Sequence, residues 1–208
     1  MLIRYCLMIA GLMMSLICSG CGPIIGVMIA PFHRPPMIDA EYELPDGEVL
    51  ILVDDRYVSD RHPRIRKILT HALADELKEH TDVKQILPYA SLASFRAGRT
   101  DFYSLRPEVV GRELGAKTVI EVIICRLRLR GGAGGPLFHG EIEVRSKVVN
   151  VKNGRQLWPD EHRGRTVRTT IPVHESRSKD HPEQLAEQLS EQLALRLAQL
   201  FYDHRAER

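Results

Sequence analysis

Two strand-forming segments joined by a glycine-rich loop constrain the fold of this chain most strongly. Thr118–Arg130 is apolar on both faces in its first half and alternates aliphatic residues with arginines in its second half. After the loop Gly131–Pro136, the segment His139–Lys152 alternates apolar and charged residues. Alternation with a period of two is typical of strands that have one covered and one solvated face. The pattern therefore predicts a long antiparallel hairpin.

The charged side chains of these two segments predict the pairing of the hairpin. In antiparallel register, Arg126 lies opposite Glu143 and Arg128 lies opposite Glu141. Together with Arg130, these arginines are candidate contacts for an anionic ligand or partner, such as a lipid or a glycan. The glutamates share their face and offset part of the charge, so a solvated sheet face is the favoured interpretation.

The other segments follow strand and helix patterns in turn. Val49–Val53 is an unbroken aliphatic run, typical of a central strand covered on both faces. Pro63–His80 places apolar residues at helical spacing. Further strands are predicted at Val83–Leu87, Gln156–Trp158 and Thr166–Val173, and further helices at Ser91–Arg96, Ser104–Leu114 and Pro182–Asp203.

This order of elements predicts the fold class. It is strand, helix, strand, helix, three strands and a final helix, and it indicates an α/β (α+β) domain. We expect a mixed, mostly antiparallel sheet of about five strands with two to three packed helices. The leucine stripe of the last helix (Leu185, Leu189, Leu193, Leu197 and Leu200) is expected to pack on this sheet rather than on a partner helix.

The N-terminal residues carry the features of a secretory signal. A single basic residue, Arg4, precedes the apolar run Tyr5–Cys18, and the small residues Ser19 and Gly20 stand before Cys21. This ending resembles a bacterial lipobox. The resemblance implies cleavage between Gly20 and Cys21 and a lipid, such as palmitate, on Cys21. In the lipobox a leucine usually stands where this chain has Cys18.

The chain is predicted to consist of four parts. They are the signal peptide 1–20, an apolar and proline-rich tether 21–45, a single α/β domain 46–203 and a charged tail 204–208. Because Gly22 rather than aspartate follows the cysteine, the sorting rule for lipoproteins favours the outer membrane over the inner one. An uncleaved anchor is the alternative, because Tyr5–Phe32 contains no Asp, Glu, Lys or Arg and is long enough to span a bilayer.

Composition and motifs exclude several classes of function. The net charge of +2 gives no support to a nucleic-acid partner. Three of the four cysteines, Cys6, Cys18 and Cys21, lie at the start of the chain, so Cys125 has no partner for a disulfide framework. The sequence contains no nucleophile elbow and no histidine or cysteine spacing typical of a metal site. We therefore predict no catalytic residue, no metal and no cofactor.

Asp54 and Asp55 are the exception that keeps a second function open. They follow the first predicted strand, at the end where open α/β sheets bind ligands or Mg²⁺. Aspartates at this position are more commonly turn or cap residues. The alternative function is thus an enzyme, or a domain that binds a small ligand or a metal, that uses these two carboxylates.

Two segments carry a resemblance to a group of bacterial envelope domains. Matching positions are Gly115, Ala116, Val119 and Ile120 in the first segment, and Asn150, Val151, Asn153, Gly154, Leu157 and Trp158 in the second, where Asn150 replaces the aspartate that is usual in the group. The group comprises the amino-terminal domain of TolB, the lipoprotein LpoB and the periplasmic part of CsgG, and the resemblance covers Val49–Trp158.

The resemblance implies a small, non-enzymatic α/β domain that binds another envelope protein or assists an export or cell-wall machine. With the lipid on Cys21, it implies a membrane-anchored protein that faces the periplasm. It carries over no partner-binding residue and indicates no oligomeric state.

Overall fold

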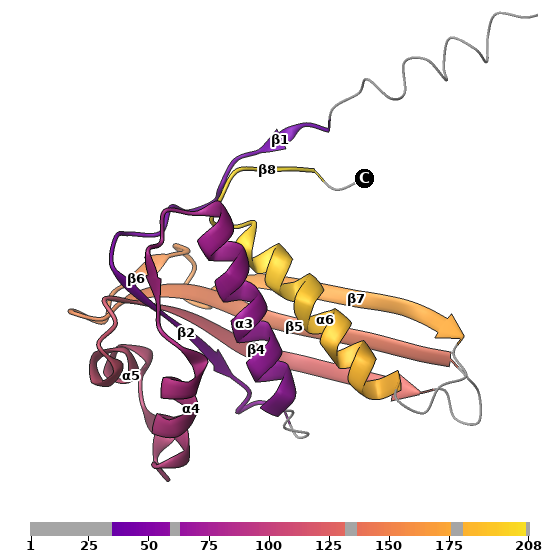
Figure 1. The fold of residues 1–208 in the computed structure, drawn as a ribbon, viewed down its shortest axis with the longest axis horizontal. Helices are drawn as coiled ribbons and strands as arrows, with labels where there is room; N and C mark the ends of the chain where they lie inside the picture. The colour runs from indigo at the N-terminus through magenta and orange to yellow at the C-terminus, as the bar shows by residue number, and fades with distance from the viewer. Residues whose placement is uncertain (1–34, 59–62, 132–136, 176–180, 207–208) are drawn as a thin grey trace, which may run out of the picture. The chain divides into compact units, whose positions relative to one another are not determined.

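The computed structural model describes residues 35–58, 63–131, 137–175 and 181–206 (Figure 1). The leader, with Gly20 and Cys21, lies outside these residues. The chain forms two compact units, and the larger one covers Asp39–His204. Two short strands that the sequence did not predict, β1 (Met37–Ile38) and β8 (His204–Arg205), form a separate two-stranded sheet.

A mixed sheet forms the centre of the larger unit. Its strands follow the order β3-β2-β4-β5-β6, and β7 also pairs with β5. The strands are β2 (Glu48–Asp54), β3 (Gln85–Ile86), β4 (Thr118–Gly131), β5 (Leu137–Asn150), β6 (Gln156–Trp158) and β7 (Arg165–Glu175). β2 is parallel to β3 and β4, whereas all pairings of β5 are antiparallel. This topology confirms the predicted α/β class with a mixed, mostly antiparallel sheet.

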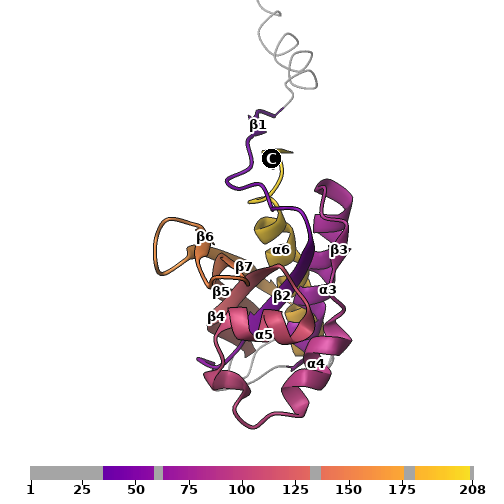
Figure 2. The same ribbon diagram turned by 90° about the vertical axis from the view of Figure 1, so that its left-hand side faces the viewer.

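Helices pack on both faces of the central strand β2. The helices are α3 (Pro63–His80), α4 (Tyr89–Ala97), α5 (Pro107–Leu114) and α6 (His181–Ala198), with a 3₁₀ turn at Phe102–Ser104. Val49, Ile51 and Val53 lie in one core with α3 and α6. Leu50 and Leu52 lie in a second core on the opposite face with α4 and α5 (Figures 1 and 2). The unbroken aliphatic run of β2 is explained by this double burial.

The leucine stripe of α6 packs on the sheet, as predicted. Leu189, Leu193 and Leu197 are fully buried in the first core. Where α6 crosses β5, a Cβ on Gly140 would lie 2.5 Å from Cδ1 of Leu189, so any larger residue there would force Leu189 to shift. The helix ends at Ala198, earlier than the pattern indicated.

The hairpin of β4 and β5 has the predicted register. Arg126 lies opposite Glu143 and Arg128 lies opposite Glu141. The pairing shifts by one residue between Ile124 and Arg126, which leaves an extra residue at Cys125 and forms a β-bulge. Before the bulge, the even-numbered residues of β4 face the core of α3 and α6. After it, the odd-numbered residues do.

Candidate functional sites

Asp54 ends β2 and is held by the arginine two residues later. Its carboxylate accepts a hydrogen bond of 2.9 Å from the backbone N–H of Arg56 and one of 2.5 Å from Nε of the same residue. The backbone contact is an Asx turn, the turn role that the sequence favoured for this position. The side chain of Asp54 is buried, so its carboxylate is paired with the Arg56 guanidinium rather than solvated by water.

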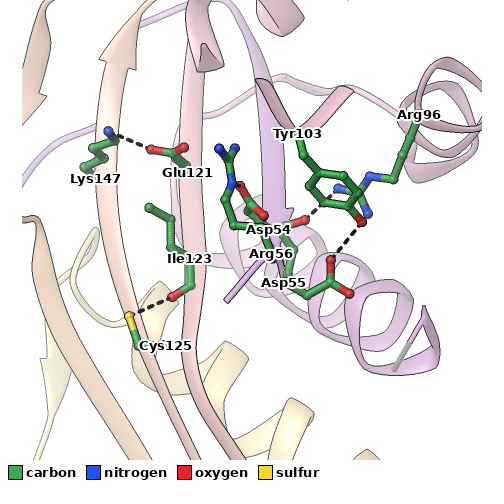
Figure 3. Close-up of polar contacts among 10 residues, drawn as sticks. Asp54, Asp55, Arg56, Arg96, Tyr103, Glu121, Ile123, Cys125 and Lys147 are labelled. Carbon is green, nitrogen blue, oxygen red and sulfur yellow. Dashed lines mark hydrogen bonds and ion pairs between the residues drawn. The ribbon is translucent and has the colours of Figure 1, made fainter. Parts of the chain in front are cut away.

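Asp55 joins three elements that are distant in the sequence. Its carboxylate forms an ion pair with Arg66 of α3. It also accepts a hydrogen bond of 3.1 Å from the hydroxyl of Tyr103 (Figure 3). The side chains of Arg66 and Asp55 are only 11% and 3% exposed. This buried pair fastens the end of β2 to α3 and to the 3₁₀ turn.

Arg96 of α4 adds a further cation to this network. Its guanidinium donates a hydrogen bond of 2.7 Å to the backbone oxygen of Val53 and lies 4.6 Å from the centre of the Phe102 ring. Burial lowers the pKa of Arg96, and the positive charge of Arg66 lowers it further. Among the described residues, Nε of each of these two arginines is buried without a hydrogen-bond partner.

The sheet has a switch in strand order at this point, because β2 connects to β3 on one side and β4 follows on the other. A cation placed here would first have to displace Arg56 or Arg66 from Asp54 or Asp55. The geometry therefore fits a structural junction of buried ion pairs. The described residues hold no group of three or more histidine, cysteine, aspartate or glutamate side chains that could bind a metal.

A second site lies on the face of β4, β5 and β7 that points away from α3 and α6. We call it the arginine face, and it consists of Arg126, Arg128, Glu141, Glu143, Arg145 and Arg168. Glu141 lies within ion-pair distance of three guanidinium groups, at 3.7 Å from Arg126, 3.6 Å from Arg128 and 3.7 Å from Arg168. Glu143 pairs with Arg168 as well. One carboxylate thus serves several cations.

The arginines cover the glutamates on this face. The side chains of Arg126, Arg128 and Arg168 are 44%, 51% and 54% exposed, whereas that of Glu141 is 13% exposed. The layer that meets solvent is therefore positive, although carboxylates of the same face offset part of its charge. In Figure 1, α4 and α5 lie toward the end of the sheet at which β4 begins.

Glu143 gives this face a dependence on pH. Hydrogen bonds from Arg168 lower the pKa of the Glu143 carboxyl below its ordinary value. Its stabilising contribution is then present above the pKa of the unfolded chain and is lost as pH falls through the lower folded pKa. We expect Glu143→Gln to lower the free energy of unfolding at pH 7 by less than about 1 kcal/mol. The difference from the parent chain should vanish in urea titrations at acidic pH, and a difference that grows there would contradict this assignment.

Cys125 lies beside the arginine face rather than in the core. An uninterrupted alternation along β4 would place Cys125 on the same side as Leu127 and Leu129, in the core. Instead its side chain is partly exposed, and its Sγ accepts a hydrogen bond of 3.1 Å from Nε of Arg145. The bulge accounts for the difference, because it interrupts the alternation at this residue. Nearby, Nζ of Lys147 is 2.8 Å from Oε2 of Glu121 (Figure 3).

The structure places the predicted site residues in two separate regions. Asp54 and Asp55 lie at the end of β2, whereas Arg126 and Arg128 lie on the arginine face. Arg130 belongs to β4, but its side chain is outside the described residues. Arg66, Arg96 and Tyr103 were not predicted, because arginines on amphipathic segments usually face solvent. Arg168 was missed because the position of β7 next to β5 could not be read from the sequence.

A cavity with acidic walls lies elsewhere in the larger unit. Its volume is about 820 Å³, and its lining includes Glu43, Asp46, Glu79, Asp82 and Asp203.

Across the described part of the chain, we find no helix with the length and apolar character needed to cross a membrane.

Comparisons with known proteins give neighbours in structure only. No protein-family model and no curated protein matches the sequence. Lipoprotein GNA1162 from Neisseria meningitidis is 16% identical over 71% of this chain and 98% of its own, with a TM-score of 0.40. The C-terminal domain of LpoB from Salmonella enterica is 14% identical over 72% of this chain and 93% of its own, with a TM-score of 0.36.

A further neighbour is the PelC dodecamer from Paraburkholderia phytofirmans. It is 14% identical over 82% of this chain and 99% of that chain, with a TM-score of 0.45. The neighbours thus include bacterial lipoproteins, among them LpoB, which belongs to the group that the sequence resembles.

Proposed function

We propose that this chain is a lipid-anchored envelope protein whose α/β domain is a non-catalytic binding or scaffold module. Its partner would be another protein of an export or cell-wall assembly machine. The observation that carries this proposal is the state of Asp54 and Asp55. Both occupy the end of β2 where a ligand could bind, and both are engaged in buried ion pairs with Arg56 and Arg66.

The anchor is supported by the sequence alone. Ser19 and Gly20 before Cys21 suit a lipobox, and the apolar run before them suits a secretory signal. We propose cleavage at this point, a lipid on Cys21 and a domain that faces the periplasm. Gly22 supports the outer membrane rather than the inner one.

Replacing Cys21 with alanine tests the anchor. We expect Cys21→Ala to abolish incorporation of radioactive palmitate in growing cells, because the acylated thiol is gone. Cys6→Ala is the matched control and should leave the incorporation unchanged, since that residue lies in the proposed leader but outside the lipobox. Labelling that persists in the Cys21 variant would disprove the lipoprotein assignment.

Crosslinking in native membranes tests the binding role. The full chain, crosslinked in place and recovered, should yield one envelope protein reproducibly, identified by mass spectrometry.

A double variant, Asp54→Ala with Asp55→Ala, that stays folded by circular dichroism but loses a metal-dependent activity would contradict the non-catalytic assignment. It would favour the alternative function in which the two carboxylates bind a ligand.

A further inference from the structure

The arginine face has the charge distribution of a surface that meets anions. Four arginines and two glutamates (Arg126, Arg128, Arg145 and Arg168 with Glu141 and Glu143) give it a net charge of about +2 at neutral pH. The guanidinium groups of three of them reach solvent, while Glu141 lies beneath. An anion that approaches therefore meets cations first.

The three exposed arginines are distributed over a sheet face rather than gathered in a pocket. Arg126 and Arg128 come from β4 and Arg168 comes from β7, with β5 between them. Their shared counter-ion, Glu141, lies 3.6 to 3.7 Å from each of them, so no single guanidinium has a carboxylate to itself except Arg168 with Glu143. A guanidinium matches the geometry of a phosphate with two parallel N–H groups. Such a face suits several phosphate groups side by side.

We propose that the arginine face rests on the anionic phospholipid headgroups of the membrane that holds the chain. This inference goes beyond the proposed function but rests on its anchor. Gly22–Ile38 between Cys21 and the larger unit can span at most about 60 Å, which confines the domain to within that distance of its lipid anchor. At that high effective concentration, a few weak charge contacts are enough to orient the domain.

A thiol on the arginine face can report whether the membrane covers it. Thr170 is exposed and pairs with Glu141 across β5 and β7, and Gln192 is exposed on α6. The full chain, purified from membranes with Cys125→Ser and either Thr170→Cys or Gln192→Cys, is reconstituted into vesicles. The vesicles contain phosphatidylcholine alone or phosphatidylcholine with phosphatidylglycerol, and the rate of labelling by a soluble maleimide is measured.

The expected result is selective protection. Phosphatidylglycerol should slow labelling at position 170 by about tenfold and leave position 192 unchanged, and 0.5 M salt should remove the protection, as expected for screened charge contacts. The triple variant Arg126→Gln, Arg128→Gln, Arg168→Gln should label equally in both vesicles. The matched triple variant Arg64→Gln, Arg99→Gln, Arg155→Gln should still be protected.

Three outcomes would overturn the inference. Equal labelling of position 170 in both vesicles means that lipid does not cover the face, while the anchor stands. Protection that occurs in native membranes but not with phosphatidylglycerol assigns the face to an acidic protein instead. If the chain does not co-float with either kind of vesicle in a density gradient, both the anchor of the proposed function and this inference are contradicted.

Discussion

Replacing Asp55 with alanine should lower the free energy of unfolding by about 3–5 kcal/mol, because it leaves the Arg66 charge buried without a carboxylate. The Arg66 side chain is only 11% exposed, so water cannot take the place of Asp55. The nearby Arg96 cation adds repulsion once the aspartate is gone, since the two arginines already influence each other electrostatically. Urea unfolding of the purified chain at pH 7, followed by circular dichroism, measures the loss.

Two companion variants separate this cause from a general effect of losing an aspartate. Asp101→Ala removes an exposed ion pair with Arg99 and should leave the urea midpoint almost unchanged. Arg66→Met in the Asp55→Ala chain removes the unpaired charge and should restore part of the lost stability. If Asp55→Ala and Asp101→Ala unfold at the same urea concentration, the buried pair does not hold the end of β2 as described.

The second large effect is expected at Leu193, in the middle of the α6 stripe. Leu193 is fully buried in the core between α3, α6 and the sheet. Leu193→Ala should lower the free energy of unfolding by about 2–5 kcal/mol through lost burial and the cavity left behind. Urea or thermal unfolding of the purified chain measures it.

Gln192→Ala is the control for this prediction, because it changes an exposed residue on the same helix. It should alter stability by no more than about 0.5 kcal/mol. A Leu193→Ala chain that keeps full stability and instead loses a bound partner would indicate that the leucine stripe packs on a partner helix rather than on the sheet.

The elements that could be predicted are those whose signal is local. The five aliphatic residues Val49–Val53 indicate a doubly covered strand whatever packs on it, and β2 is such a strand. Opposite charges spaced along the two arms of the hairpin determine its register, because a shift by one residue would reverse every side chain. The register of Arg126 with Glu143 confirms it.

The parts that could not be predicted depend on contacts between distant segments. Arg66 and Tyr103 meet Asp55 only because α3 and the 3₁₀ turn pack around the end of β2. Nothing in the neighbouring sequence of either residue indicates burial. The strand β7 also runs through Pro172 to Glu175, two residues beyond the predicted end at Val173. Its pairing with β5 is irregular there, between Phe138 and Gly140, so the proline does not interrupt a regular ladder.

The extra residue at Cys125 has a genetic consequence. Loss of this single codon would remove the bulge and restore a regular ladder, because Arg126 opposite Glu143 already follows Ile124 opposite Val144 in register. Arg126 and Arg128 would stay on the arginine face, and Leu127 and Leu129 would stay on the core side. Substitutions of the cysteine should be tolerated, since the backbone rather than the thiol sets the direction of the side chains that follow. Neither the length nor the residue identity at this one position is therefore as constrained as the alternation on either side of it.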